Sequence, residues 1–141
     1  MKHIAILGST GSVGTQTLDV VRQYREQFCV IGLSAHTNID LLQKQINEFH
    51  PAVVCVTDVH AAKRFRAEMN QSHVNVLVGQ ESLLELVSDE RVNMVINALV
   101  GIAGILPTFA AIEHDKDVAL AKRSNIPPGT WARKSPLIRR Q

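Results

Sequence analysis

Short apolar runs alternate along the chain with stretches whose apolar residues recur every three or four positions. The runs are rich in Val and Ile and lack strict polar alternation, which is typical of strands buried on both faces of a parallel sheet. Six strands are predicted, at residues 3–7, 29–34, 53–57, 75–78, 94–97 and 118–121. Because a helical pattern follows each of the first five runs, the predicted fold class is α/β, with a doubly wound parallel sheet covered by helices on both faces.

The intervening stretches predict five helices. The first contains Val13 and extends to Tyr24. Asn38 is a suitable N-cap for the second, which ends where His50 precedes Pro51. The third and fourth are predicted at residues 59–70 and 82–87, and the fifth follows residues 101–104 and runs to residue 114, with a proline tolerated in its first turn.

The helical and strand pattern stops at residue 121. We therefore expect one domain at residues 1–121, which is enough chain for one ordinary core, and an irregular basic tail at residues 122–141. The tail holds six of the chain's 15 Lys and Arg residues and no acidic residue, so nine basic residues face 13 acidic ones in the body. This mildly acidic body argues against nucleic-acid binding, and no apolar run approaches the roughly 20 residues of a membrane span, so a cytoplasmic protein is expected.

A glycine-rich turn follows the first predicted strand directly. Gly8, Gly11 and Gly14 are spaced as G-x-x-G-x-x-G, and a helical pattern begins at once after them. A strand, a glycine turn and a helix N-terminus in this order direct free peptide N–H groups and the positive end of a helix dipole at one point, which favours a phosphate group. Thr15 and Gln16 stand where an NTPase phosphate loop requires Lys and Ser or Thr, so a dinucleotide in a Rossmann-like fold is the preferred ligand.

The end of the second predicted strand indicates which nicotinamide coenzyme is bound. An Asp or Glu in this place would accept hydrogen bonds from a free 2′-hydroxyl and repel a 2′-phosphate, and residues 30–38 contain neither. His36, Thr37 and Asn38 are suited instead to a phosphate next to a helix N-terminus, so NADP is predicted. A purely structural role for Asn38, as a helix cap, stays open beside this interpretation.

A second glycine segment, at residues 97–104, lies where the fifth strand should end, on the same sheet edge as the first turn. Its glycines, including Gly101, would let the backbone approach the middle and nicotinamide half of a coenzyme, although tight loop geometry alone also explains them. The predicted coenzyme-binding residues are accordingly Gly8, Thr10, Gly11, Ser12, Val13, Gly14, His36, Thr37, Asn38 and Gly101.

Cysteine and histidine add no further site. Cys29 and Cys55 each lie within an apolar run, which predicts reduced, buried thiols. The six histidines are scattered without the close pairing of a metal site, so no metal ligand and no catalytic residue is assigned.

Two long motifs resemble the N-terminal domain of the 1-deoxy-D-xylulose 5-phosphate reductoisomerase family. The first comprises residues 6–14 (ILGSTGSVG) with 17–21 (TLDVV), and the second comprises residues 97–108 (NALVGIAGILPT) with 110–112 (AAI). The resemblance covers residues 1–121. It implies an NADPH-dependent enzyme of non-mevalonate isoprenoid biosynthesis that converts 1-deoxy-D-xylulose 5-phosphate to 2-C-methyl-D-erythritol 4-phosphate, acts with Mg²⁺ or Mn²⁺ and forms a homodimer.

The resemblance also implies roles for single residues. Thr10, Gly11, Ser12 and Val13 would contact the pyrophosphate and the nicotinamide side, and Asn38 would lie near the 2′-phosphate. Where the family has Gly-Lys-Asn, however, this chain has His36, Thr37 and Asn38, so it lacks a lysine that would face the 2′-phosphate.

After residue 121 the family's Asn-Lys-Glu-Ser is replaced by KRSN, and the family's metal-binding carboxylates and substrate site have no counterpart in residues 122–141. We therefore expect no turnover from this polypeptide alone. Two alternatives stay open: a stand-alone nucleotide-binding or regulatory module whose tail docks a partner, and a small NADP reductase of the semialdehyde-dehydrogenase type, which would need a nucleophilic cysteine.

Overall fold

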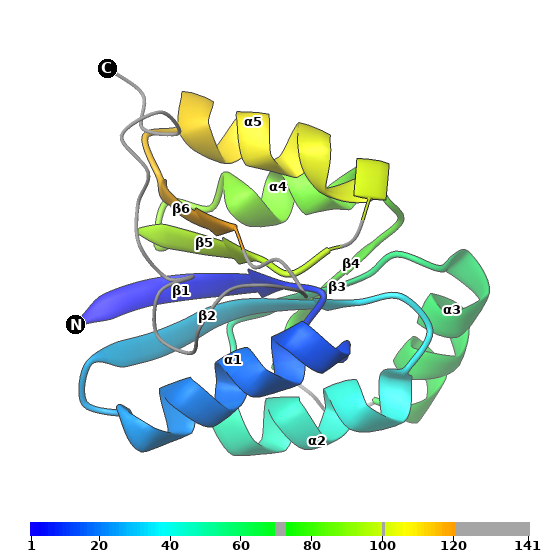
Figure 1. Cartoon of the computed structure of the whole chain (residues 1–141). Coiled ribbons are helices and arrows are strands. Elements are labelled where there is room, and N and C mark those ends of the chain that lie inside the picture. The colour runs from blue at the N-terminus through cyan, green and yellow to red at the C-terminus, as the bar shows by residue number, and fades with distance from the viewer. Residues whose placement is uncertain (70–72, 100, 121–141) are drawn as a thin grey trace.

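The computed structural model describes residues 1–69, 73–99 and 101–120, and six parallel strands among them form one sheet (Figure 1). The strand order is β4-β3-β2-β1-β5-β6. Their bounds are β1 Lys2–Leu7, β2 Phe28–Ala35, β3 Val53–Val56, β4 Asn75–Val78, β5 Met94–Asn97 and β6 Asp117–Leu120. The helices are α1 Ser12–Gln23, α2 Ile39–Phe49, α3 Val59–Glu68, α4 Ser82–Val87 and α5 Ile105–Glu113, with a 3₁₀ turn η1 at Gly101–Gly104.

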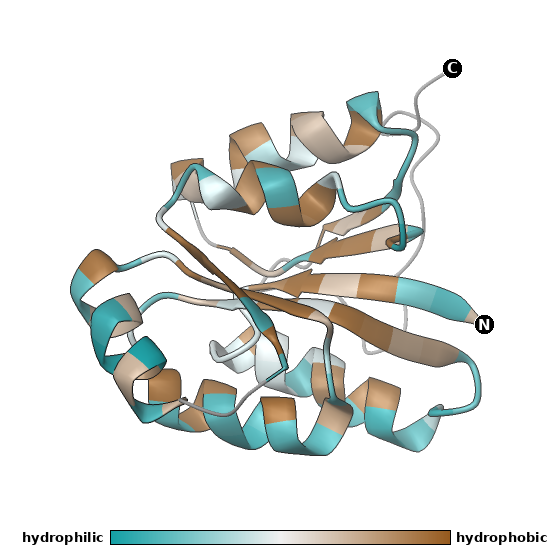
Figure 2. Cartoon of the chain, turned by 180° about the vertical axis from the view of Figure 1, so that it is seen from behind, coloured by the Kyte–Doolittle hydropathy of each residue, from teal (hydrophilic) through white to brown (hydrophobic). Residues whose placement is uncertain are grey.

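The helices form one layer on each face of the sheet. In Figure 1, α1, α2 and α3 lie on one side, and α4 and α5 lie on the other. Each layer has its own apolar cluster: Ile4 and Ile6 of β1 point into the first, whereas Ala5 and Leu7 point into the second. Figure 2 shows the same division by hydropathy, with largely hydrophobic strands between helices that carry many hydrophilic residues.

The chain changes direction across the sheet between β1 and β5. From β1 it proceeds outward through α1, α2 and α3 to β4 at the edge, and α4 then returns along the opposite face to β5 beside β1. The connections that leave the carboxyl ends of β1 and β5 therefore diverge to opposite faces. This divergence opens a crevice at that edge, which is where open α/β sheets bind their ligands.

One glycine inside the sheet makes room for the second helical layer. A Cβ on Gly32 of β2 would lie 2.5 Å from Cδ1 of Leu86 in α4. Leu86 is completely buried, so α4 packs against the sheet at the place where β2 has no side chain.

The predicted fold class is confirmed, and the six strands and five helices agree with the pattern to within a few residues. Most differences are of one or two residues at the ends of elements, as in the last strand, which begins at Asp117 rather than residue 118. Gly101–Gly104, for which no regular element was predicted, forms a 3₁₀ turn. The predicted tail at residues 122–141 lies outside the described residues. Among the described residues, no helix is long and apolar enough to cross a membrane.

Candidate functional site

A cleft of about 500 Å³ lies at the carboxyl ends of the strands, where the two crossovers diverge. Loops following five of the six strands contribute to it. Its lining residues are Gly8, Thr10, Gly11, Ser12, Val13, Ser34, Ala35, His36, Thr57, Gln80, Leu83, Ala98, Leu99 and Ala103. Six of the ten predicted binding residues are among them, and Gly14, Thr37, Asn38 and Gly101 are not.

The three glycines of the first turn meet different constraints. Gly8 has a φ of +77°, a backbone conformation that L residues rarely adopt. A Cβ on Gly14 would lie 2.0 Å from the carbonyl oxygen of Gly8, so Gly14 lets the first turn of α1 pack on the strand end. A Cβ on Gly11 would meet only the Gly8 oxygen, at an ordinary 3.6 Å. The fold therefore demands glycine at positions 8 and 14, but leaves room for a side chain at position 11.

The N-terminus of α1 is suited to an anion. Its N-cap, Gly11, supplies no side-chain acceptor to the first turn, and the first turn contains no acidic residue. The N–H groups of a helix's first turn have no acceptor within the helix, and the helix dipole places partial positive charge there. Because Gly11, Ser12 and Val13 all line the cleft, this positive end borders the space that a ligand would fill.

The glycine turn is held by β2 and α2, through residues that the sequence pattern did not single out for this role. Ser34 Oγ accepts a hydrogen bond from the Gly8 N–H at 2.8 Å, and the Ser34 carbonyl accepts one from the Ser9 N–H at 2.8 Å. From the other side, Gln45 of α2 bonds to the side chain and the carbonyl of Ser9. No sequence signal identifies these contacts, because they depend on how distant elements pack.

The residues after β2 separate into two groups. His36 lines the cleft, and its Nδ1 lies 2.9 Å from the hydroxyl oxygen of Thr57, which fixes the ring at the end of β3. Thr37 and Asn38 are exposed and lie outside the lining. Asn38 caps α2, since its side-chain oxygen accepts a hydrogen bond from the Leu41 N–H at 3.2 Å. The capping role is thus present, and a nucleotide contact for Asn38 stays a prediction.

The second glycine segment is organised by a buried amide. Asn97 is only 5% exposed, and its Nδ2 donates to the Gly104 carbonyl at 2.9 Å and to the Thr108 hydroxyl at 2.7 Å. Its Oδ1 accepts from the Leu99 N–H at 3.1 Å, which brings Leu99 to the cleft wall. Gly101 has a φ of +71° and open space where a Cβ would stand, so the structure explains this glycine by the turn that begins η1.

The opposite wall of the cleft comes from the segment after β4. Gln80 and Leu83 line it, the latter from the first turn of α4. Neither belongs to a recognisable motif, and only the crossover of α4 to the far face brings them beside the glycine turn.

Metal and thiol chemistry find no support in this part of the molecule. Among the described residues, no group of three or more His, Cys, Asp or Glu side chains is placed to hold a metal ion. Both cysteines are free thiols; Cys55 is buried, as expected, whereas Cys29 is only partly buried. Burial, together with the nearby Glu85 carboxylate, raises the pKa of the Cys55 thiol to about 12, so at neutral pH it is protonated and a poor nucleophile.

Comparison with known proteins gives a family. The model for 1-deoxy-D-xylulose 5-phosphate reductoisomerase matches residues 4–126. The enzyme of that name from Thermoanaerobacter pseudethanolicus is 47% identical over 123 residues, covering 87% of this chain and 32% of that protein. The one from Crocosphaera subtropica is 42% identical over 132 residues, covering 92% of this chain and 33% of that protein.

Solved structures agree. A DOX-P reductoisomerase in complex with NADPH, fosmidomycin and magnesium superposes with a TM-score of 0.82 at 33% identity, over 86% of this chain and 30% of that one. The Zymomonas mobilis enzyme in complex with NADPH gives 0.79 at 28% identity, over 86% of this chain and 32% of that one. This chain therefore spans about a third of the length of the relatives it matches. The family match over residues 4–126, the sheet and the glycine turn together show that the chain belongs to the 1-deoxy-D-xylulose 5-phosphate reductoisomerase family.

Proposed function

We propose that this chain binds NADPH in the cleft at the β1–β5 divergence, as the coenzyme-binding part of a 1-deoxy-D-xylulose 5-phosphate reductoisomerase. The reaction would convert 1-deoxy-D-xylulose 5-phosphate to 2-C-methyl-D-erythritol 4-phosphate. The observation that carries the proposal is the N-terminus of α1, which borders the cleft directly after a glycine turn. It has no side-chain cap and no acidic residue in its first turn. Two structural neighbours of this part of the family were solved with NADPH, which supports the same choice.

The turn residues would hold the pyrophosphate. In this proposal, the peptide N–H groups of Ser12 and Val13 donate to phosphate oxygens, while the Gly11 N–H donates to the Gly8 carbonyl at 3.2 Å and closes the turn. The absence of a Cβ on Gly11 lets those oxygens approach the backbone. When bound, NADPH supplies the hydride that reduces the substrate. Ala98, Leu99 and Ala103 would form an apolar wall on the side of β5, shielding that part of the coenzyme from water.

The segment after β2 would favour the 2′-phosphate. No acidic residue stands at residues 30–38 to repel it, and His36 faces the cleft with its ring held by Thr57. The exposed Thr37 and Asn38 would add hydrogen-bonding groups near the start of α2. Preference for NADPH over NADH therefore rests on the absence of an acidic residue that would repel the 2′-phosphate and on the polar side chains of His36, Thr37 and Asn38, with no lysine at position 37.

The divalent metal implied by the family does not fit the described residues, which contain no cluster of three potential ligands. We assign no metal-dependent step to them. Assembly as a homodimer and location in the cytoplasm stay predictions.

Calorimetric titration of the 141-residue chain with NADPH and with NADH, side by side, tests the proposal. We expect saturable one-site binding of NADPH and weaker binding of NADH. Binding of NADH alone, or tighter binding of NADH than of NADPH, would contradict the choice of coenzyme. Failure of both to bind would contradict the assignment of the cleft.

A further inference from the structure

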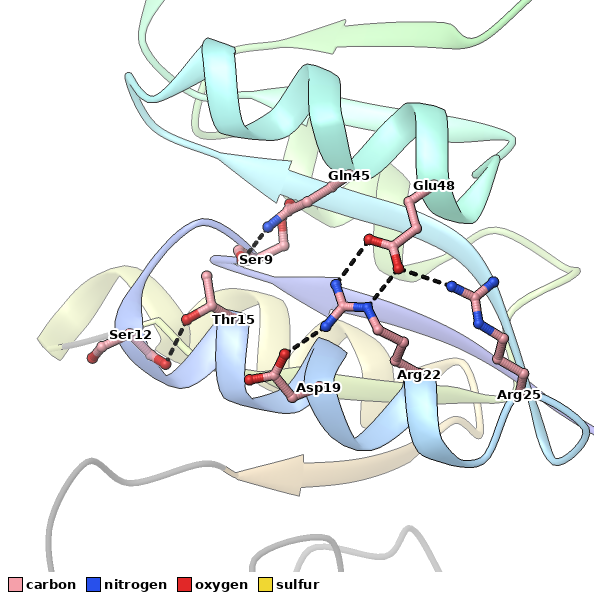
Figure 3. Close-up of polar contacts among 8 residues, drawn as sticks. All are labelled: Ser9, Ser12, Thr15, Asp19, Arg22, Arg25, Gln45 and Glu48. Atoms are coloured by element: carbon pink, nitrogen blue, oxygen red, sulfur yellow. Dashed lines mark hydrogen bonds and ion pairs between the residues drawn. The ribbon is translucent and has the colours of Figure 1, made fainter.

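A glutamine from α2 is inserted into the apolar layer behind the glycine turn. Gln45 is 5% exposed, and its neighbours Leu42 and Ile46 belong to the apolar cluster between helices and sheet. Its Nε2 donates to the Ser9 carbonyl oxygen at 2.9 Å, and its Oε1 accepts from the Ser9 hydroxyl at 2.7 Å (Figure 3). The amide thus uses its donor and its acceptor on one residue of the turn.

The contact with the carbonyl determines how the next peptide N–H points. The Ser9 carbonyl and the Thr10 N–H belong to the same peptide unit, which is planar and trans, so the two groups point in opposite directions. Because Gln45 holds the carbonyl on the side of α2, the Thr10 N–H is turned away from α2. Thr10 lines the cleft, and no residue of α2 is among the lining residues, so the N–H is turned toward the side where a ligand would lie.

The other peptides of the turn are fixed in the same manner by β2. Ser34 accepts the N–H groups of Gly8 and Ser9, so two successive peptides are anchored to the sheet before Gln45 anchors the third. Ser34 itself lines the cleft, so a change there would alter both the turn and the ligand's surroundings. Gln45 does not line the cleft, and both hydrogen bonds of its side chain are made to Ser9.

Burying the Gln45 amide in an apolar layer costs free energy, so we interpret its presence as a means of fixing the backbone conformation of the turn. Removing its partners would leave polar groups unpaired in an apolar layer, whereas a leucine or methionine would pack there without that demand. Among the described residues, every buried polar side-chain atom has at least one hydrogen-bond partner, so neither Nε2 nor Oε1 of Gln45 is left unpaired.

We infer that Gln45 is a positioning residue for the phosphate-binding turn: it orients the Ser9–Thr10 peptide so that the Thr10 N–H is presented to the coenzyme before binding. The inference rests on the proposed function, because the group to be bound is the NADPH pyrophosphate. Preorganised donors bind more tightly than donors that must first be ordered.

The test compares Gln45→Met with Ile46→Val in the 141-residue chain. Methionine keeps the length and helix propensity of glutamine but lacks the amide, and Ile46→Val weakens the neighbouring, equally buried position of α2 without touching the turn. We expect Gln45→Met to raise the calorimetric Kd for NADPH about tenfold and Ile46→Val to leave it within twofold, even where thermal unfolding shows that both variants are less stable. Equal Kd values for wild type and Gln45→Met would overturn the inference while leaving the proposed function intact. Absence of NADPH binding to wild type would overturn both.

A second variant separates positioning from simple packing. Gln45→Glu keeps the shape, and its protonated carboxyl can both donate to the Ser9 carbonyl and accept from the Ser9 hydroxyl, whereas the ionised form can only accept. We expect its affinity for NADP⁺, divided by that of wild type at the same pH, to rise at least fivefold as the pH falls from 8 to 5.5. A ratio that stays constant while the introduced carboxyl changes its protonation state over this range would mean that Gln45 acts by packing alone, which contradicts the inference.

Discussion

Glycines of a nucleotide-binding turn can be required by the protein or by its ligand, and this turn contains both kinds. Gly11 has φ −76° and ψ 175°, extended values that any residue adopts, and a Cβ there would make only an ordinary 3.6 Å contact with the Gly8 oxygen. We expect Gly11→Val to fold with a loss of no more than about 1 kcal/mol, because only the quality of the N-cap changes. NADPH affinity should fall at least a hundredfold, since the new side chain occupies the approach to the backbone.

The matched control is Gly14→Ala. Its Cβ would lie 2.0 Å from the Gly8 carbonyl, so the turn and α1 must separate, and overpacking of this kind costs at least about 1–3 kcal/mol. For both variants, circular dichroism on heating measures the stability of the fold, and calorimetry with NADPH measures the affinity. Retained binding by Gly11→Val would show that the turn is only architectural.

Thr37 allows a gain of affinity to be tested. It is exposed and lies just before α2, at the position where the family resemblance implies a lysine facing the 2′-phosphate. Thr37→Lys should strengthen NADPH binding by about 1.5–3 kcal/mol, the size of a charge-assisted hydrogen bond, and leave NADH binding nearly unchanged. Thr37→Gln, which is long but uncharged, is the control. If Thr37→Lys strengthened the binding of NADPH and of NADH equally, the new side chain would not contact the 2′-phosphate.

At the scale of single residues, the sequence predicts roles that depend on the local backbone better than it predicts contacts between distant elements. The cap at Asn38 and the glycine at position 8 follow from local backbone needs, and both are visible in the pattern. The roles of Ser34 and Gln45 are not, because a buried serine or glutamine acquires its partner only when β2 and α2 pack on the turn. Whether the predicted residues bind a coenzyme stays a prediction.

Between elements, α1 and α2 are joined at their distant ends by charged side chains (Figure 3). Glu48 of α2 accepts hydrogen bonds from Nη2 of Arg22 and Nη2 of Arg25, each at 2.8 Å, and both guanidinium groups lie over the Phe49 ring at 5.4 and 5.3 Å. The hydrogen bond from Arg22 is the main cause that lowers the pKa of Glu48 below its usual value. These charged contacts therefore hold α2 against α1, and the hydrogen bonds of Gln45 hold α2 against the glycine turn that precedes α1.

Glu48→Gln should destabilise the fold by about 0.2–1 kcal/mol at pH 7, the range for exposed ion pairs. Because the pKa of Glu48 is lower in the folded state, its contribution is present above the unfolded value of 4.5 and is lost as the pH falls through the folded value. The difference in urea midpoint between wild type and variant should therefore shrink below about pH 4.5 and in high salt. A difference that is the same at pH 3 and pH 7 would assign the effect to side-chain packing.

The elements themselves were largely predictable. The strands β3 and β5 are buried throughout, and Ser82–Val87 agrees with its predicted bounds. The exception is Gly101–Gly104, for which the pattern predicts no regular element and where the buried amide of Asn97 stabilises a 3₁₀ turn. That amide lies in the preceding strand, and no local pattern reveals which carbonyl it will reach.

For the whole molecule, the alternation of strands and helices predicts a parallel sheet, but it does not specify the strand order. The placement of β5 beside β1, and of Gln80 and Leu83 across from the glycine turn, follows from the single long return by α4. Such contacts join residues far apart in sequence, so the shape of the cleft became visible only in three dimensions.

A ligand in this cleft would contact both helical layers, because α1 belongs to one and Leu83 of α4 to the other. Binding to the folded state alone stabilises it by mass action, by about 2.7 kcal/mol at a hundredfold excess over Kd. We therefore expect NADPH to raise the thermal midpoint of the whole domain in a single transition, increasing with ligand concentration. The thermal midpoint can be followed by two probes, one in each helical layer. If NADPH raised the midpoint reported by only one of them, the ligand would contact only one side of the sheet.

Gly32 has a consequence for how this domain can vary. The terminal methyl of Leu86 occupies the space in which any larger residue at position 32 would place its Cβ, so the two positions share one fixed volume. Alanine at position 32 would force the Leu86 side chain to shift unless position 86 carries a shorter residue, and a shorter residue at position 86 alone would leave a void. Substitutions at these two sites should therefore be tolerated in compensating pairs that keep the combined volume of the two side chains constant.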